Sequence, residues 1–294
     1  MKLLKMLILI SALPFISCTK GPSSLVNKIV SDSGVPEKRV YKEFHSDKFA
    51  MDKLEVHIFY PEGYDADREE PYKVAAYFHG GGWSQGSPSE GYPYAEHFAS
   101  LGFIALSFEY RLVDYINVTG IECVKDVNSA IRWLRTFNKE LNIDTDHIAA
   151  VGLSAGGHLV IANSMFPGII EEGEDAQISS VPDLVWAFAP PVTFKNNNLY
   201  MAVGLDSEQV LQICPMTNVV SGNVPVYIIH GDRDSLVYYD DSVLFVKKMQ
   251  EAGNESELWT IREGKHSSFW ENKEHMNYVC SVINDQMKKI KWIE

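Results

Sequence analysis

Cysteine is scarce in this chain of 294 residues, which contains only four. Cys18 lies close to the N-terminus, while Cys123, Cys214 and Cys280 are widely spaced. Three widely spaced cysteines cannot form a complete disulfide framework, although a single disulfide among them stays open. The sequence has no CxxC pair and no Cys/His cluster, so we expect neither a structural metal nor a cofactor. The three later cysteines are expected to be small buried apolar residues.

Positive charge is also in short supply. Lys and Arg total 26 against 39 Asp and Glu, which gives a formal net charge of -13. A surface this acidic repels phosphate backbones, and no basic stripe offsets it, so nucleic acid is excluded as the expected partner. The 46% hydrophobic residues, 20 Gly and 13 Pro are ordinary for a globular protein. This composition argues against a disordered, collagen-like or repeat chain.

Long apolar runs are absent after the first seventeen residues, so the chain is not a multispanning membrane protein. Within those residues, two lysines precede the apolar stretch Leu7–Ile16, which is too short to span a bilayer and is typical of a secretory signal peptide. A small residue and then Cys18 close the stretch. This arrangement resembles the bacterial lipoprotein signal, although Phe15 stands where a leucine is usual. The resemblance implies that Cys18 receives lipid; the alternative is a plain signal peptide cleaved just before it.

These features divide the chain into three parts. Residues 1–17 are the expected signal peptide, residues 18–38, with Gly, Pro and Ser, are the expected tether, and residues 39–294 are expected to form a single domain. The protein is then exported and held in the cell envelope by its lipid, periplasmic or outer-membrane associated, or is otherwise secreted. Membrane contact is expected through that lipid alone, and the oligomeric state is left open.

Strand and helix patterns alternate along the expected domain. Continuously apolar runs such as Ile148–Val151 and Val226–Ile229 are typical of central parallel strands covered on both faces. The pattern predicts an α/β fold with a mostly parallel, twisted, eight-stranded sheet, helices on both faces and antiparallel edge strands. Strands are expected at Val40–Phe44, Leu54–Tyr60, Lys73–Phe78, Phe103–Phe108, His147–Leu153, Leu184–Ala189, Val226–His230 and Leu258–Arg262. Helices are expected at Tyr92–Ser100, Val124–Leu141, Ala155–Ser164, Asp240–Glu251 and Glu274–Lys289.

Two stretches interrupt this alternation. One, near residues 166–182, is acidic, and the other, near 192–224, contains three successive asparagines and a short helical piece near Glu208–Ile213. Long inserts at the border of an active site usually act as lids or substrate walls, so both are expected to be lid-like.

A serine motif follows the apolar run Ile148–Val151. The sequence GLSAGGH begins at Gly152 and matches GxSxG where a strand should end and a helix begin. Glycines beside the serine let strand and helix approach closely, and the turn exposes the Ser154 hydroxyl. The helix N-terminus favours the negative charge that develops there. The pattern indicates that Ser154 is a nucleophile.

A second glycine-rich motif, HGGGW, begins at His79 after an earlier apolar strand. Three successive glycines leave backbone N–H groups uncovered, so these groups can converge on an oxyanion. The expected oxyanion hole consists of the N–H groups of Gly81, Gly82 and Ala155.

A nucleophilic serine needs a base, and the base needs an orienting acid. HGDRD begins at His230 after one expected strand, and GKHSSF, containing His266, follows another. The order Ser, Asp, His is therefore available, with each residue after a strand's carboxyl end. We assign Asp234 as the acid and His266 as the base, with Asp232 as the competing acid. Most of the remaining histidines are expected to be solvated or, like His230, to brace their loops. His158 is set aside because it lies inside the helix after the serine turn, and His275 because it lies on the final helix.

HGGGW, GLSAGGH, HGDRD and GKH in this order resemble the α/β-hydrolase superfamily. The resemblance is closest to the hormone-sensitive-lipase-like branch and the bacterial acetyl, feruloyl and carbohydrate esterases, and it extends over about residues 40–289. Glu109-Tyr110-Arg111-Leu112, Asp126 and Cys214-Pro215 add to it, although relatives often have serine at position 214. The resemblance implies the α/β-hydrolase fold and the triad Ser154–Asp234–His266 with the oxyanion hole given above.

This resemblance implies a serine carboxylic-ester hydrolase that works through an acyl-enzyme. Trp83 and Trp270 flank the expected site in sequence and are predicted to contact substrate, because aromatic walls suit sugar rings or short acyl groups. We therefore expect a short-chain ester, such as an acetylated or feruloylated carbohydrate. Two alternatives stay open: a serine peptidase of the prolyl-oligopeptidase type, and a catalytically silent binding protein with the same fold.

Overall fold

The computed structural model describes residues 36–44, 52–114, 117–195 and 199–294. The expected signal peptide, Cys18 and most of the expected tether lie outside these residues. In the part of the chain that is described, none of the helices combines the length and apolar character needed to cross a membrane.

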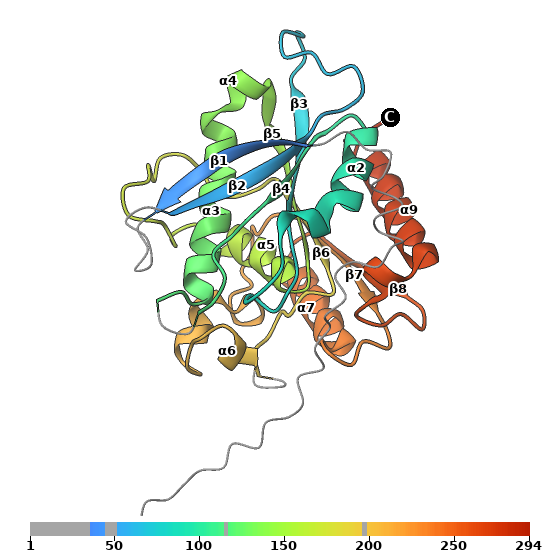
Figure 1. Cartoon of the computed structure of the whole chain (residues 1–294). Coiled ribbons are helices and arrows are strands. Elements are labelled where there is room, and N and C mark those ends of the chain that lie inside the picture. The colour runs from blue at the N-terminus through green and yellow to red at the C-terminus, as the bar shows by residue number, and fades with distance from the viewer. Residues whose placement is uncertain (1–35, 45–51, 115–116, 196–198) are drawn as a thin grey trace, which may run out of the picture.

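The described strands form one eight-stranded sheet in the order β1-β2-β4-β3-β5-β6-β7-β8 (Figure 1). Its mostly parallel character was predicted. The antiparallel edge was predicted correctly only on one side, where β2 runs antiparallel to β1 and β4; at the other edge β8 is parallel to β7. The strands are β1 Glu37–Phe44, β2 Asp52–Phe59, β3 Tyr72–Phe78, β4 Ile104–Phe108, β5 Ile143–Leu153, β6 Leu184–Phe188, β7 Val226–Gly231 and β8 Ser256–Ile261.

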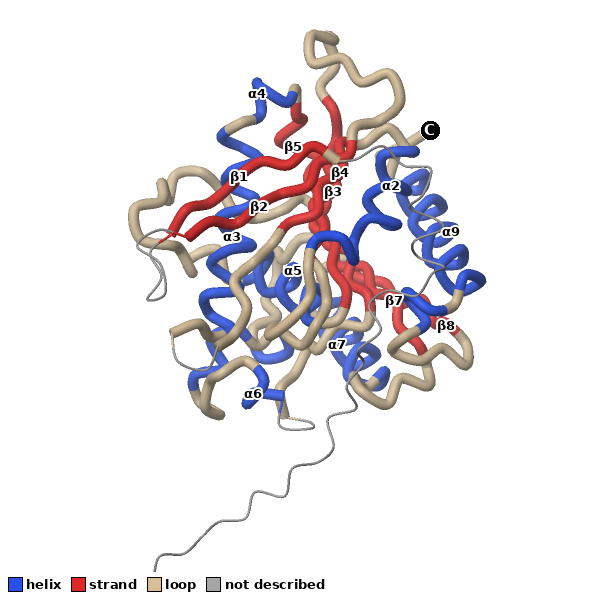
Figure 2. Tube along the Cα trace, viewed as in Figure 1, coloured by secondary structure: helices blue, strands red, loops and turns tan. Residues whose placement is uncertain are grey.

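Helices cover both faces of the sheet, as Figure 2 shows. Alternation along β3 sends Val74, Ala76 and Phe78 into one hydrophobic core and Ala75 and Tyr77 into the other. Helices α3, α5 and α7 pack into the first core, and α2 and α9 into the second. The helices are α2 Tyr92–Ser100, α3 Gly120–Thr136, α4 Asn138–Leu141, α5 Ala155–Met165, α6 Leu199–Ala202, α7 Tyr239–Glu251, α8 Ser268–Glu271 and α9 Lys273–Lys289, with 3-10 turns η1 Pro88–Gly91, η2 Gln209–Ile213 and η3 Pro215–Thr217.

The prediction of one helix over Val124–Leu141 was wrong at its start and in its continuity, because two helices occupy this stretch. Helix α3 begins earlier, because Thr119 and Glu122 form a capping box in front of it. It ends at Thr136, and the short helix α4 carries the chain on to Leu141. The apolar spacing continues across the junction, so the break was not visible in the sequence pattern.

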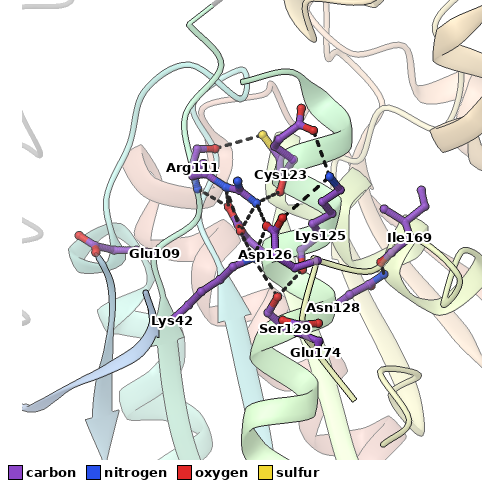
Figure 3. Close-up of polar contacts among 12 residues, drawn as sticks. Lys42, Glu109, Arg111, Cys123, Lys125, Asp126, Asn128, Ser129, Ile169 and Glu174 are labelled. Atoms are coloured by element: carbon purple, nitrogen blue, oxygen red, sulfur yellow. Dashed lines mark hydrogen bonds and ion pairs between the residues drawn. The ribbon is translucent and has the colours of Figure 1, made fainter. Parts of the chain in front are cut away.

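The acidic insert at residues 166–182 is held against α3 by a partly buried cluster of charges (Figure 3). Asp126 of α3 accepts hydrogen bonds from Lys42 of β1 at 2.6 Å and from Arg111 at 2.8 Å. Glu171 of the insert pairs with the same two cations. Burial alone would raise the pKa of Glu171, but the hydrogen bond and charge of Lys42, together with Arg111, lower it to about 2. The insert therefore ties α3 to β1, and its lid-like role stays a prediction.

The insert at residues 192–224 follows the carboxyl end of β6 and carries α6, η2 and η3. Ser154 follows the carboxyl end of β5, the neighbour of β6 in the sheet. This second insert therefore begins at the same edge of the sheet as Ser154, and its lid-like role stays a prediction.

Candidate active site

Ser154 occupies the sharp turn between β5 and α5. Its backbone has φ 55 and ψ -117, a conformation that residues other than glycine rarely adopt. A Cβ atom at Gly152 would lie 2.3 Å from the Gly156 carbonyl oxygen, and one at Gly156 would lie 2.1 Å from that of Phe78. Both positions of the motif therefore require glycine, because the turn packs backbone against backbone.

The glycine-rich loop after β3 lies directly beside this serine. A Cβ atom on Gly80 would be 3.5 Å from the Cβ atom of Ser154. Gly81 and Gly82 have φ 111 and 59, which are conformations that favour glycine. Ala155 is the first residue of α5, where backbone N–H groups have no partner within the helix. The structure thus places Ala155 and the loop that carries Gly81 and Gly82 next to Ser154, and the oxyanion hole stays a prediction.

The three predicted triad residues meet although 112 residues separate Ser154 from His266. The Nε2 atom of His266 lies 2.9 Å from the Ser154 Oγ atom. The Nδ1 atom of His266 lies 2.6 Å from the Oδ2 atom of Asp234. A base thus contacts the serine hydroxyl on one side and a carboxylate on the other, which is the arrangement that a nucleophilic serine needs.

Asp234 is held in place by more than the triad histidine. Its Oδ1 atom accepts hydrogen bonds from the backbone N–H groups of Leu236 and Val237, each at 2.9 Å. Its Oδ2 atom also contacts Nε2 of the buried His230 at 3.1 Å. Burial by itself would raise the pKa of Asp234, but the hydrogen bonds from His230 and His266 hold it well below its usual range. The competing acid, Asp232, is exposed.

His230 was predicted to brace its loop, but its contact with Asp234 was not predicted. His230 is 0% exposed, and its Nδ1 atom lies 2.8 Å from the Ser242 hydroxyl. Its place at the end of β7, four residues before Asp234, was the available indication. His230 therefore belongs to the hydrogen-bond network that orients the triad.

The two tryptophans predicted to contact substrate occupy different surroundings. Trp83 is 2% exposed, and its indole Nε1 donates a hydrogen bond to Nδ1 of His158 at 3.1 Å. Its side chain therefore belongs to the interior in this structure, which corrects its assignment to substrate contact. Trp270 on α8 is 39% exposed, and its ring centroid lies 5.9 Å from that of His266. Trp270 remains the predicted substrate contact.

Two buried histidines make the fold sensitive to acid. Burial lowers the pKa of His79 and of His158 to about 4, against an ordinary value of 6.5. At pH 5 the folded chain keeps both neutral, whereas the unfolded chain protonates both. Proton binding then favours the unfolded state, and stability falls as pH drops from about 6.5 towards about 4.

We expect the free energy of unfolding to fall by about 4 kcal/mol between pH 7.5 and pH 5, roughly half from each histidine. Urea unfolding at the two pH values measures this change. In a His158→Gln variant the fall should be about half as large, because one of the two groups is gone. An equal fall in variant and parent would show that His158 does not contribute.

Several known proteins are similar to this chain in sequence. The BD-FAE family model matches residues 58–174, a span that contains both the HGGGW and the GLSAG motifs. Among curated proteins, esterase LipC of Mycobacterium tuberculosis is 26% identical over 199 residues, 62% of this chain and 49% of LipC. The non-reducing polyketide synthase atr1 of Stereocaulon alpinum is 23% identical over 83% of this chain and 13% of the synthase. The chain thus spans about half of LipC and a small part of the synthase.

Solved structures of an esterase match this chain over most of its length and over most of their own length. Esterase 2 of Thermogutta terrifontis, phosphoramylated by tabun, has a TM-score of 0.79 and 29% identity, covering 88% of this chain and 96% of that esterase. The same esterase with propionate or with butyrate bound has a TM-score of 0.77, at 29% identity and 95% coverage of that chain. The architecture is therefore that of the α/β-hydrolases, and the similarities support an esterase family with this fold.

Proposed function

We propose that this chain, an α/β-hydrolase by fold with relatives among the esterases, is a serine carboxylic-ester hydrolase that acts on short-chain acyl esters. The observation that carries the proposal is the contact of His266 with Ser154 on one side and with Asp234 on the other. The bound propionate and butyrate of the Thermogutta esterase support a short acyl group.

In this proposal His266 removes the proton of Ser154 while Ser154 Oγ attacks the ester carbonyl carbon. The N–H groups of Gly81, Gly82 and Ala155 stabilise the tetrahedral oxyanion. His266 then gives its proton to the leaving alcohol oxygen, and an acyl-enzyme remains on Ser154. Water attacks this ester with His266 again as base, and the free acid and the serine hydroxyl are restored. Asp234 stabilises the histidine cation at both steps.

The position of Trp270 supports a carbohydrate as the alcohol part of the substrate. His266 protonates the leaving alcohol, so groups beside His266 face the alcohol rather than the acyl chain. Trp270 is the exposed aromatic residue that contacts this histidine. An exposed aromatic ring suits the apolar face of a sugar. We therefore propose an acetylated or feruloylated carbohydrate as the substrate class.

A substrate panel tests the proposal by measuring released acid from acetylated xylan, feruloylated oligosaccharide, p-nitrophenyl acetate and p-nitrophenyl decanoate, with a peptidyl-proline amide as the peptidase substrate. We expect the acetyl esters to be cleaved faster than the decanoate and the peptide not at all. In Trp270→Ala, kcat/KM should fall about threefold to tenfold for acetylated xylan and change little for p-nitrophenyl acetate.

Tyr278 of α9 has the same 39% exposure as Trp270, so Tyr278→Ala is the matched control. An equal loss in both variants, or equal losses on both substrates, would contradict sugar contact by Trp270. Cleavage of the peptide with no ester hydrolysis would overturn the proposed function in favour of a peptidase.

We further propose that the chain is exported and lipid-anchored through Cys18, so that glycan esters outside the cell are within reach. The sequence pattern of residues 1–18 supports this proposal.

A further inference from the structure

The glycine-rich loop after β3, called the oxyanion loop below, has positive φ angles at three successive residues. Gly81, Gly82 and Trp83 have φ 111, 59 and 62. Glycine adopts such angles freely, but they strain a residue that has a Cβ atom. Trp83 therefore needs compensating contacts, and its side chain supplies them in the interior, at 2% exposure.

The principal polar contact of Trp83 is His158. The indole Nε1 donates to Nδ1 of His158 at 3.1 Å, and Nε2 of His158 donates to the Ile213 carbonyl oxygen at 2.8 Å. Because Nδ1 must accept and Nε2 must donate, this histidine is neutral with its proton on Nε2. Phe194 packs edge-on against the His158 ring, with centroids 5.0 Å apart, and lies 5.9 Å from the Trp83 ring.

His158 is also bonded to the turn that carries the nucleophile. It lies in the first turn of α5, and its backbone N–H donates to the Ser154 carbonyl oxygen at 3.0 Å. Its side chain is 0% exposed, so it has no direct access to substrate. One buried imidazole therefore joins three elements: the helix that carries Ser154, the oxyanion loop through Trp83, and the insert at residues 192–224 through Ile213 and Phe194.

We propose that His158 is a positioning residue that keeps Gly81 and Gly82 in their oxyanion-binding conformation through its hydrogen bond to Trp83. The inference rests on the proposed ester hydrolysis. Oxyanion donors act only when they are already in place as charge develops, and a loop of three glycines has many other conformations available. The bond from Trp83 to the nucleophile helix restricts that choice. Its loss weakens binding of the transition state and leaves binding of the neutral ester nearly unchanged.

Kinetics of Trp83→Phe, His158→Leu and the double variant test this role. Each single variant should lower kcat about tenfold to a hundredfold with KM changed by less than about twofold. The double variant should lose little more than either single one, because both remove the same bond. His158→Gln should recover most of kcat, because its amide can accept from Trp83 and donate to Ile213.

Two further measurements separate positioning from loss of folded protein. Titration with a fluorophosphonate counts reactive serines, so that kcat is expressed per active site. Affinity for a methyl trifluoromethyl ketone reports the hole itself, because Ser154 Oγ adds to its carbonyl carbon, His266 takes the proton, and the oxygen becomes an oxyanion. We expect this affinity to fall in parallel with kcat. His97→Leu is the control, since it removes the bond of His97 to Asn284 on α9, which packs into the other core. It should leave kcat per active site unchanged.

Unchanged kcat per active site and unchanged ketone affinity in Trp83→Phe would overturn the proposal. Trp83→Phe keeps an aromatic ring in the core, so this outcome is accessible even where His158→Leu does not fold. A parent protein that hydrolyses no ester and is not labelled would overturn the proposed function as well, whereas an active parent with unaffected variants would overturn the role of His158 alone.

Discussion

Ser154→Ala is expected to abolish ester hydrolysis, with kcat lower by a factor on the order of 10⁴–10⁶. Its Oγ atom is the group that His266 contacts at 2.9 Å, and no acyl-enzyme forms without it. The fold should survive the change. Alanine keeps the Cβ atom, so the backbone strain at φ 55 is unchanged. The backbone hydrogen bonds of residue 154 with Phe188 and His158 also remain.

Rates on p-nitrophenyl acetate and labelling by a fluorophosphonate measure this effect together. The parent should be modified on the peptide that contains Ser154, and the variant should not be modified. Ser235→Ala, at an exposed serine next to Asp234, is the control and should keep the parental rate. A Ser154→Ala protein that is still labelled, or that hydrolyses the ester at the parental rate, would place the nucleophile elsewhere.

The central sheet and the triad residues could be predicted because each strand and each motif is recognisable from residues that are neighbours in the sequence. Apolar runs such as Val226–Ile229 are buried on both faces and so carry their own strand pattern. The glycines of the serine turn are required by backbone contacts of less than 3 Å, which makes the motif recognisable in sequence. Since parallel strands end at one edge of the sheet, residues after different strands were expected to meet there.

Features that depend on distant partners could not be predicted. The ion pairs of the acidic insert could not be predicted, because the cations that hold Glu171, at positions 42 and 111, lie far from it in sequence. Trp83 looked like a substrate contact because the direction of its side chain depends on φ 62, which no local pattern encodes. His158 was set aside as a helix residue because its partners, Trp83 and Ile213, come from separate loops. Only the folded sheet brings these groups together.

Asp234→Asn is expected to lower kcat by a factor on the order of 10⁴, by analogy with the same change in a serine protease. The carboxylate accepts the Nδ1 proton of His266, which leaves Nε2 free to take the serine proton. An asparagine amide that donates to Nδ1 instead reverses the tautomer, and Nε2 can no longer act as a base. Because the pKa of Asp234 is held well below its usual range, protonation of this group does not produce the same loss near neutral pH.

Asp232→Asn provides the matched control, since the two acids lie in one loop and differ in burial. Asp232 is exposed, whereas the Asp234 carboxylate is fully buried among His230, His266 and two backbone N–H groups. Asp232→Asn should keep kcat within about twofold of the parent, because an exposed charge in this position contacts no reacting group. Steady-state rates at one pH and fluorophosphonate titration of both variants give the comparison per active site. If Asp232→Asn were the more damaging change, the acid of the triad would have to be reassigned, and the hydrogen bond from His230 would belong to the structure of the loop alone.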